Sequence, residues 1–414
     1  MQINYHSTNG IKKFNLGLFG NNAWIVLVIS AVSVLPLFLS QYPPCVDIPQ
    51  HAGQIELYKE MHSQSFPYRS LFKIHLMTPY LLGYFIVYML SMIVSISWAI
   101  KITLAGAMMA TPVMTGKVLK AIGSNELLAL LVIPSIYGFS FNWGFLNFIV
   151  AIPVGIMLLG GLIRKNQVQS RYDKIKVALL INFLFFCHAL VWAFFFGISI
   201  LILLFQERSA KKFLSRVLPF LSSLPVVFLW FFYITKNNHS IISSKINFSM
   251  GVWRLNPLPL IFGTNTFSLY MGLFAGILCL PVMVGGRFSK DWARYIPVMA
   301  SLFVVSVFPH SFLDIAFIYE RFTPFIVPFY LFVFDFRLNG APVRSKIFAW
   351  VAIYGLVLVF VLNQAIIMSL FNQESSRYTD IQNKMKEGKR VLMLMYMRDS
   401  EYSVARVYLH FPLW

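Results

Sequence analysis

Acidic residues are scarce in this chain. Its 15 aspartates and glutamates stand against 34 lysines and arginines, which leaves a formal net charge of +19. A basic excess of this size is compatible with nucleic-acid binding. The basic residues, however, lie in short clusters between hydrophobic segments, which is the distribution found in cytoplasmic loops of membrane proteins. We therefore exclude nucleic acid and expect the clusters to face anionic membrane lipids.

Cysteine is also rare, and several common motifs are missing. The three cysteines (Cys45, Cys187 and Cys279) include no CxxC pair, which argues against a zinc site and a structural disulfide. The sequence has no glycine-rich phosphate loop, and it has no internal repeat of the kind that many transporters use. The leader contains Lys12 and Lys13 but no small-residue cleavage site, so we expect the first hydrophobic segment to be retained.

Hydrophobic residues are abundant instead. They make up 58% of the chain, while charged residues make up only 12%. A soluble domain has about 45–50% apolar and about 25% charged residues. Apolar runs near the ~20 residues needed to cross a bilayer recur along the chain, and they are continuous rather than alternating. Because a helix satisfies its own backbone polar groups in lipid, the pattern predicts an all-α polytopic membrane protein.

The basic clusters indicate the topology. Spans are predicted near residues 24–40, 100–120, 126–141, 145–163, 176–189, 190–206, 213–235, 268–286, 295–311, 317–335 and 347–370. The clusters comprise Lys117, Lys120, Arg164, Lys165, Arg171, Lys174, Lys176, Arg208, Lys211, Lys212, Arg216, Arg287, Lys290, Arg294, Arg337, Arg344 and Lys346. With about eleven crossings they all fall on one side, which places the N-terminus in the cytoplasm and the C-terminus outside.

Two segments fit this topology less simply. Residues 79–96 are apolar enough to cross, but a crossing there would turn the later basic clusters outward, so we expect a helix in the outer interface or a re-entrant helix. The predicted spans 176–189 and 190–206 are short. They are either two crossings or a re-entrant hairpin bent around Cys187 and His188.

The chain divides into a membrane domain and a short tail. Residues 1–371 form the predicted transmembrane domain, with 41–99 as its first extracytoplasmic loop. Residues 372–414 form an extracytoplasmic C-terminal segment. Its polar start predicts a short helix ended at Gly388, and RVLMLMYM (390–397) predicts a buried strand. We expect the beginning of a small α/β unit there.

Asp47 is the leading candidate for a catalytic residue. It follows the first predicted span, and Pro43, Pro44 and Pro49 flank it. These prolines restrict the backbone, so the loop is able to aim a carboxylate at a reacting group. A carboxylate at the mouth of a membrane cavity indicates proton transfer or cation binding. The alternative is a solvated loop acid with a role in the turn.

Further polar residues follow Asp47. If a helix begins at Pro49, His51 is positioned to act as a proton partner of Asp47 or as a ligand; the alternative is a surface histidine. Glu56 and Glu60 lie four residues apart and, with His62, are compatible with a divalent cation. No spacing signature requires a metal, so we do not favour one.

Two histidines lie among apolar residues further along the chain. His188 sits in FFCHALVW, and His310 sits in FPHSFLD at the end of a predicted span. A polar side chain is costly to bury in a membrane without a partner. Each histidine therefore either lines a polar cavity and contacts substrate or binds a single backbone carbonyl.

Basic residues near the predicted outer face are candidates for phosphate binding. Arg321, next to Glu320 in IYERF, has the planar guanidinium suited to phosphate. Lys101 begins the second predicted span, and Arg254 lies in an outer loop. We predict that these residues and Glu320 contact substrate; the alternative for the cations is interfacial anchoring.

The segment GFSFNWGFLNF, residues 138–148, lies at a predicted outer turn between two spans. Its asparagines and glycines are compatible with a sugar pocket in which Trp143 is a stacking face. They are equally compatible with a turn and an aromatic belt at the membrane interface.

The order of these features resembles the GT-C superfamily of polytopic glycosyltransferases over most of residues 1–370. PPCVDIPQH occupies the place of the essential carboxylate after the first span, TPYLLGYFIVYML is similar to the interfacial helix, and IYERF is similar to the span that begins with an arginine. SISWAIKITLAG has Lys101 where an arginine is common. DxPxH and the C-terminal YLHF are similar to a poorly characterised bacterial group.

The resemblance implies a function and a location. It implies a bacterial cytoplasmic-membrane enzyme that uses a polyprenyl-phosphate-linked sugar as donor, with Asp47 as the carboxylate and Arg321 near the donor phosphate. The acceptor is a glycan, a lipid or a protein. No DxD motif follows the first span, which puts a metal-dependent variant in doubt, and the short C-terminal segment leaves acceptor recognition open.

Two other functions remain compatible with the sequence. One is a transporter or flippase for a lipid-linked substrate, and the other is a non-catalytic subunit of surface-glycan assembly. An enzyme requires that Asp47 and Arg321 face one cavity within the length of a sugar. A transporter requires inverted repeats and polar residues at mid-membrane. The absence of repeats favours the enzyme.

Overall fold

The computed structural model describes residues 22–63, 66–163, 170–237, 246–248, 252–312, 315–336, 342–386 and 393–414. Lys12, Lys13, Arg164, Lys165 and Arg337, all assigned above to the leader or to basic loops, lie outside these ranges.

The first half of the described chain is helical, as the continuous apolar runs predict. Its elements are α1 (Ala23–Ser33), η1 (Leu35–Phe38), α2 (Ile48–Glu60), η2 (Arg69–Leu71), α3 (Leu81–Leu90), α4 (Ile96–Ala121), η3 (Glu126–Tyr137), α5 (Phe139–Trp143), α6 (Leu146–Ile163), α7 (Arg171–Cys187), α8 (Ala189–Gln206), α9 (Ala210–Leu221) and α10 (Leu224–Asn237).

The second half adds short strands between its helices. Its elements are α11 (Val252–Leu255), α12 (Leu258–Phe262), α13 (Phe267–Met283), β1 (Arg287–Phe288), η5 (Trp292–Arg294), α14 (Ile296–Val307), β2 (Ser311–Phe312), β3 (Ile315–Ala316), α15 (Ile318–Arg321), η6 (Thr323–Phe325), α16 (Ile326–Phe332), β4 (Phe334–Asp335), α17 (Val343–Ser375), α18 (Arg377–Lys384) and η7 (Phe411–Leu413). β1 pairs antiparallel with β4, and β2 with β3.

The helices are those of an all-α membrane protein. Within the described ranges, five helical segments are long and apolar enough to cross a membrane, or six if the pair α9 and α10, bent by 44°, counts as one span. The five are Ile96–Ala121, Glu126–Trp143, Leu146–Ile163, Ala189–Gln206 and Val343–Lys384. The predicted spans near 24–40, 268–286 and 295–311 correspond to shorter apolar helices.

The segment that did not fit the topology, residues 79–96, forms the ten-residue helix α3 (Leu81–Leu90). At about 1.5 Å per residue such a helix covers only about half of the ~30 Å hydrocarbon core. It packs against α4 and α6. A helix of this length fits an interfacial or re-entrant position better than a crossing.

The pair α7 and α8 is broken at His188. This residue has an extended backbone (φ −168°, ψ 119°), and its amide donates to Leu184 O at 3.0 Å, which closes α7. Its carbonyl accepts from Trp192 N at 2.9 Å, which opens α8. The two helices then pack against each other. The break at His188 lies at the boundary between the predicted spans 176–189 and 190–206.

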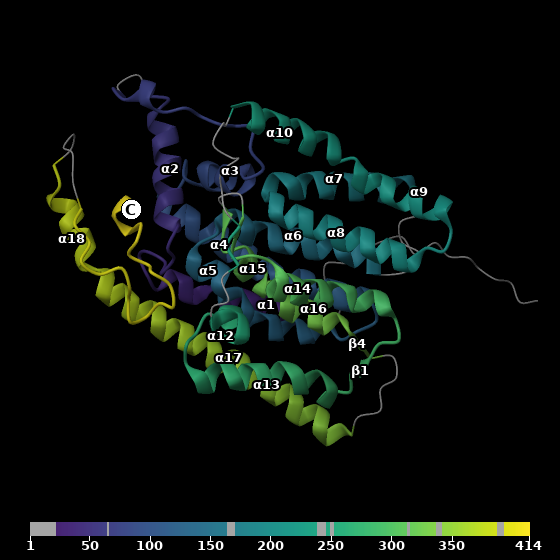
Figure 1. Ribbon diagram of the computed structural model, residues 1–414. Helices are drawn as coiled ribbons and strands as arrows, with labels where there is room; N and C mark the ends of the chain where they lie inside the picture. Colours follow the sequence, from purple (N-terminus) through teal and green to yellow (C-terminus); the bar gives the residue numbers. More distant parts are fainter. Residues whose placement is uncertain are drawn as a thin grey trace, which may run out of the picture.

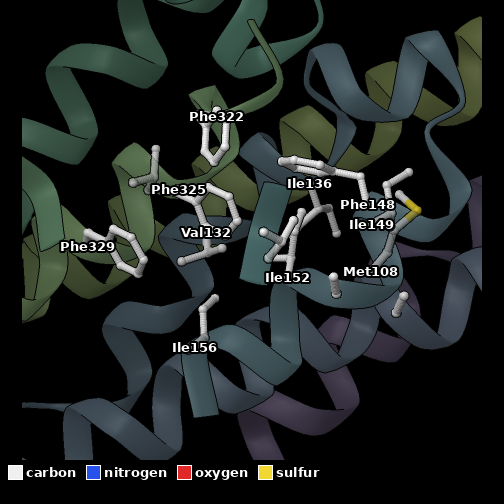
Figure 2. Close-up of a cluster of buried hydrophobic side chains, with 14 of the residues drawn as sticks. Met108, Val132, Ile136, Phe148, Ile149, Ile152, Ile156, Phe322, Phe325 and Phe329 are labelled. Carbon is white, nitrogen blue, oxygen red and sulfur yellow. The ribbon is translucent and has the colours of Figure 1, made fainter. Parts of the chain in front are cut away.

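The core lies between α4, η3, α6 and the segment η6–α16. Figure 2 shows this cluster: Met108 of α4, Ile136 of η3 and Ile152 of α6 lie on one side, and Phe325 and Phe329 of the segment η6–α16 lie on the other. All five side chains belong to one continuous cluster of buried apolar residues. The exposed faces are also apolar; Phe232 on α10 is 68% exposed and Val351 on α17 is 65% exposed. Exposed apolar faces of this extent suit a lipid environment.

The two ends of the helices differ. In Figure 1, α2, α18 and the C-terminus gather at one end, and α9 and the β1–β4 pair lie at the other. Tyr42 joins the first loop to the tail, because its hydroxyl donates to Gln382 Oε1 at 2.8 Å and its ring packs with Phe371 and Phe411. Residues 41–62 therefore meet the described parts of the tail, 372–386 and 393–414, at the same end, which we call the Asp47 end.

The tail differs in part from the prediction. The expected helix is present as α18 but ends at Lys384, before Gly388, which lies outside the described ranges. Of the predicted buried strand 390–397, residues 393–397 are irregular, and Tyr396 is 92% exposed. The prediction of a strand is wrong for this described part. A strand is stable only when it pairs in a sheet, and here the tail instead packs through η7 onto α2.

Candidate active site

A large cavity opens at the Asp47 end, among α2, α3, the start of α6, the α7–α8 junction and α15. Its volume is about 870 Å³. Its polar lining includes Asp47, His51, Gln54, Tyr80, Tyr84, Asn147, His188 and Arg321. The rest of the wall is mostly aliphatic and aromatic. A cavity of this size with a few convergent polar groups has the character of a ligand site.

Asp47 is held by its backbone. It occupies the position before α2, and Pro49 lies in the first turn of that helix. The amide of Asp47 donates to Trp143 O at 2.9 Å, and the amide of Val46 donates to Asn142 O at 3.2 Å. The segment 138–148 therefore supports the Asp47 loop directly. The sequence alone left this segment open between a pocket and a turn.

Gly144 makes this support possible. Its φ of +84° is a left-handed conformation, and a Cβ there would lie 3.0 Å from Ile48 N and 3.1 Å from Asp47 N. A side chain would therefore be strained by its own backbone and would push against the Asp47 loop.

We expect Gly144→Ala to displace Asp47 and to destabilise the protein. The left-handed backbone alone costs about 1–2 kcal/mol for a residue with a Cβ, and the close contact adds to it. Thermal unfolding of the purified protein measures the effect. Gly161→Ala, in α6 where a Cβ meets nothing within 4 Å, is the matched control and should unfold at the parent temperature or above it. Equal unfolding temperatures for the two variants would contradict the assignment.

The electrostatic surroundings of Asp47 favour proton exchange near neutral pH. Burial raises the pKa of Asp47 to about 6, although His410, Arg321 and a hydrogen bond from the Trp143 side chain favour its ionised form. His410 Nε2 lies 3.6 Å from Asp47 Oδ1. Sequence reasoning missed this histidine. Its only signal was the YLHF motif, whose position in the chain says nothing about its distance from Asp47.

Arg321 lies in the wall of the same cavity as Asp47, and each charge influences the other. Its guanidinium stacks on Phe145, 3.8 Å from the ring centroid, and its Nε is buried without a hydrogen-bond partner among the described residues. The short helix α15 positions it, and α15 begins after Phe317, whose φ of 59° is unusual for a residue with a Cβ. The arginine retains donor capacity for a ligand.

The sequence left three roles open for His51: a proton partner of Asp47, a ligand, or a surface histidine. Its Nδ1 lies 2.6 Å from Tyr84 Oη, and Tyr84 in turn bonds Gln54. Desolvation lowers the pKa of His51 to about 4, so its ring is neutral at pH 7. The histidine that lies next to the Asp47 carboxylate is therefore His410 and not His51. His51 lines the cavity as one member of a hydrogen-bonded chain.

His188 lies in the cavity wall, deep among aromatic rings. Its ring makes edge contacts with Tyr80 and Phe148 at centroid distances of 4.8 Å and 5.1 Å. Its Nδ1 is buried and has no hydrogen-bond partner among the described residues. A ligand in the cavity is able to supply that partner.

Two predicted phosphate ligands lie elsewhere. Lys101 is buried, donates to Ser40 O at 3.1 Å and lies over Trp98. Arg254 donates to Ser306 O at 2.9 Å and Phe308 O at 2.7 Å. Neither is among the described residues that line the Asp47 cavity. The prediction that they help bind a phosphate beside Asp47 is therefore not supported, because backbone carbonyls engage both cations.

His310 and Glu320 form a pair outside the Asp47 cavity. His310 Nδ1 lies 2.6 Å from Glu320 Oε1, and both residues line a smaller cavity on the other side of α15. Adjacent residues of a helix point about 100° apart, so Glu320 and Arg321 face different cavities.

The metal site considered for Glu56, Glu60 and His62 has few free ligands in the structure. Glu56 pairs with Lys59 at 3.0 Å, and His62 Nδ1 lies 2.8 Å from Tyr58 O. Glu60 is exposed at the end of α2. In the part of the chain that the structure describes, no three His, Cys, Asp or Glu residues gather as a metal site would require.

The apolar wall of the cavity reaches the surface between α3 and α7. Phe85 of α3 is 58% exposed, and Phe183 and Phe186 of α7 are 43% and 40% exposed, while all three also line the cavity. The same rings thus face both the cavity and the apolar exterior. These rings therefore join the apolar exterior of the helices to the cavity that holds Asp47 and Arg321.

In comparisons with known proteins, no protein-family model, no curated protein and no solved structure matches the chain. The similarity to the GT-C superfamily stays a prediction from sequence motifs.

Proposed function

We propose that this protein is an integral membrane glycosyltransferase that moves a sugar from a polyprenyl-phosphate donor to an acceptor hydroxyl. The observation that carries the proposal is one cavity that holds a carboxylate, Asp47, and a guanidinium, Arg321, beside an apolar wall open to the membrane-facing surface. These are the three features that such a donor requires: a base for the acceptor, a cation for the phosphate and a path for the lipid.

The donor would use the apolar and cationic parts of the cavity. Its polyprenyl chain would lie between α3 and α7, against Phe85, Phe183 and Phe186. Its phosphate would meet Arg321, whose planar guanidinium matches phosphate oxygens. His188 would add a polar contact deeper in the wall.

Asp47 would carry the chemistry. Its carboxylate takes the proton of the acceptor hydroxyl while the hydroxyl oxygen attacks the anomeric carbon of the donor sugar. The bond from that carbon to the phosphate oxygen breaks, and the lipid phosphate leaves with the bonding electrons. Arg321 stabilises the charge that develops on the phosphate. Attack opposite the leaving group inverts the anomeric configuration. His410 keeps the carboxylate oriented.

The proposal includes a GT-C-like arrangement of about eleven crossings with the Asp47 end outside the cytoplasm. The charges of the two ends support it. Lys211, Lys212 and Arg216 lie on α9 and Arg287 on β1, at the end opposite α2 and α18. The positive-inside rule assigns that basic end to the cytoplasm.

We expect cysteine labelling to report this orientation. Cys45 and Cys187 are buried and Cys279 is exposed, so the three are first replaced by serine or alanine. Single cysteines are then introduced at the exposed residues Tyr68, Arg377 and Lys211. A membrane-impermeant maleimide applied to intact cells should label the first two positions, and Lys211→Cys only after permeabilisation. Labelling of Tyr68→Cys and Arg377→Cys from opposite sides would overturn the topology.

The activity should rise with pH through about 6. Asp47 accepts a proton only when it is ionised, and its raised pKa of about 6 sets the pH at which half of the molecules are competent. Measurement of kcat/KM between about pH 3 and pH 8 reports this pKa for the free enzyme. An acid limb near 3.8, the ordinary value for aspartate, would show that Asp47 is not the titrating base.

The direct test is turnover of a panel of polyprenyl-phosphate sugars by the purified full-length protein in lipid nanodiscs. Release of the lipid phosphate together with a new glycosidic bond supports the proposal. Movement of the intact donor between leaflets, without cleavage, would instead assign the protein as a flippase. Donor binding with neither outcome would assign it as a non-catalytic subunit.

A further inference from the structure

A second cavity lies beside the Asp47 cavity, separated from it by α15 and the segment 139–145. Its volume is about 200 Å³. Phe139, Trp143 and Phe317 form an aromatic wall, with the Trp143 and Phe317 ring centroids 4.0 Å apart. Ala405 of the C-terminal segment lies in its lining. Neither Asp47 nor Arg321 lines this second cavity.

Glu320 is the unusual residue in this cavity. It is only 4% exposed. Its Oε1 is paired with His310, but its Oε2 is buried and has no hydrogen-bond partner among the described residues. The Tyr319 side chain also interacts with the Glu320 carboxyl, both as a neighbouring titratable group and through a side-chain hydrogen bond. Oε2 itself still has no partner with hydrogen-bond distance and angle among the described residues. A buried oxygen without a donor is unfavourable, so a ligand that brings a donor to Oε2 gains from filling the space.

The chemistry of the cavity selects the ligand. A metal ion would find too few ligands, since the described residues contain no group of three His, Cys, Asp or Glu. A ligand here needs a hydroxyl donor for Glu320 and an apolar face for the aromatic wall, whose ring faces are electron-rich. Asn265, also in the lining, adds an amide. A sugar ring has hydroxyl donors at its edge and C–H groups on its face.

We propose that the second cavity binds one ring of a neutral sugar, with a hydroxyl donating to Glu320 Oε2 and the C–H face against the aromatic wall. The volume is below the about 300–1,000 Å³ of sites for drug-sized ligands, as suits a single ring. In this proposal residues 138–148 have both of the roles considered for them: Phe139, Asn142 and Trp143 line the sugar pocket, and the turn at Asn142 and Trp143 supports the Asp47 loop.

Trp143 connects this cavity to Asp47. Its carbonyl accepts from the Asp47 amide at 2.9 Å, and its side chain hydrogen-bonds the Asp47 carboxylate. Its ring forms part of the second cavity. Resting on the proposed function, the ring bound here belongs to the acceptor, which identifies the acceptor class as a glycan.

Binding of methyl glycosides to the purified full-length protein tests the site. A panel of the gluco, galacto, manno and N-acetylglucosamine forms is followed by saturation-transfer difference NMR and titration. We expect at least one glycoside to bind, with affinity lowered about tenfold or more in Glu320→Gln, which removes the charge at nearly constant shape. Ala405→Phe, which fills the cavity and leaves Glu320 intact, should abolish binding.

The controls separate this site from the proposed reaction. His188→Ala, in the wall of the Asp47 cavity and not in that of the second cavity, should bind the glycoside as the parent does. Loss of binding in this variant would place the sugar in the Asp47 cavity and overturn the inference. Absence of binding by the whole panel, or unchanged binding in Ala405→Phe, would overturn it too. Should Glu320→Gln not fold, Ala405→Phe decides. Glycoside binding without any donor turnover would refute the proposed function and leave the sugar site standing.

Discussion

Asp47→Asn should abolish sugar transfer and leave the protein folded. The substitution keeps the size of the side chain and removes the group that accepts the proton of the acceptor hydroxyl. Loss of a positioned general base costs about 10²–10⁴-fold in rate. The rate of glycosidic-bond formation at saturating donor measures the loss. Activity within a few-fold of the parent would show that Asp47 is not the base, and Glu56 would be the next candidate.

The direction of the change in stability that Asp47→Asn causes also follows from the pKa of Asp47. The pKa of Asp47 is about 6 in the folded protein, above the value of 3.8 for an ordinary aspartate, so its ionised form disfavours folding. The parent therefore loses stability as the pH rises from about 4 to about 6 and stays at the lower level above that range. Asp47→Asn lacks this cost and should unfold at an equal or higher temperature at pH 7.

A matched control distinguishes the loss of the Asp47 carboxylate from the loss of any one negative charge near α2. Glu60→Gln removes an exposed carboxylate from the end of the helix that Asp47 precedes. This variant should retain full activity. Inactivity of both variants would mean that the net charge of α2, rather than the carboxylate of Asp47, controls the reaction.

Arg321→Ala should lower kcat/KM for the phosphate-linked donor by about 10²-fold or more. The substitution removes the positive charge that stabilises the negative charge developing on the leaving phosphate. The guanidinium is half-buried and stacks on Phe145, so its removal should lower stability less than activity. Arg321→Lys should restore only part of the rate, because a point charge lacks the planar fork. The measurement is donor dependence of kcat/KM, with thermal unfolding followed in parallel.

Arg69→Ala is the matched control for this experiment. Arg69 is an exposed arginine in the first loop, between α2 and α3. Its removal should leave donor dependence unchanged. If Arg321→Ala also leaves donor dependence unchanged, phosphate binding passes to another cation of the Asp47 end, and the roles of Lys101 and Arg254 reopen.

Local sequence determined the helices and the position of the carboxylate. Continuous apolar runs predict helices because a helix satisfies its backbone within a single segment, and every predicted span has a helical counterpart. The short helix α3, the break at His188 and the stiff loop around Asp47 follow from the same local rules. The strand predicted in RVLMLMYM was wrong for residues 393–397, because a strand requires a partner that the segment itself does not supply.

The tertiary structure alone decided which polar groups meet. Arg321 and His410 reach Asp47 from distant parts of the chain, since α15 and the C-terminal segment pack at the same end as α2. Packing likewise set Lys101 and Arg254 against backbone carbonyls, and it turned Glu320 away from Arg321 into a second cavity. Spacing along the sequence predicts neighbours within one helix. Contacts between helices depend on how their faces pack, which the apolar pattern leaves undetermined.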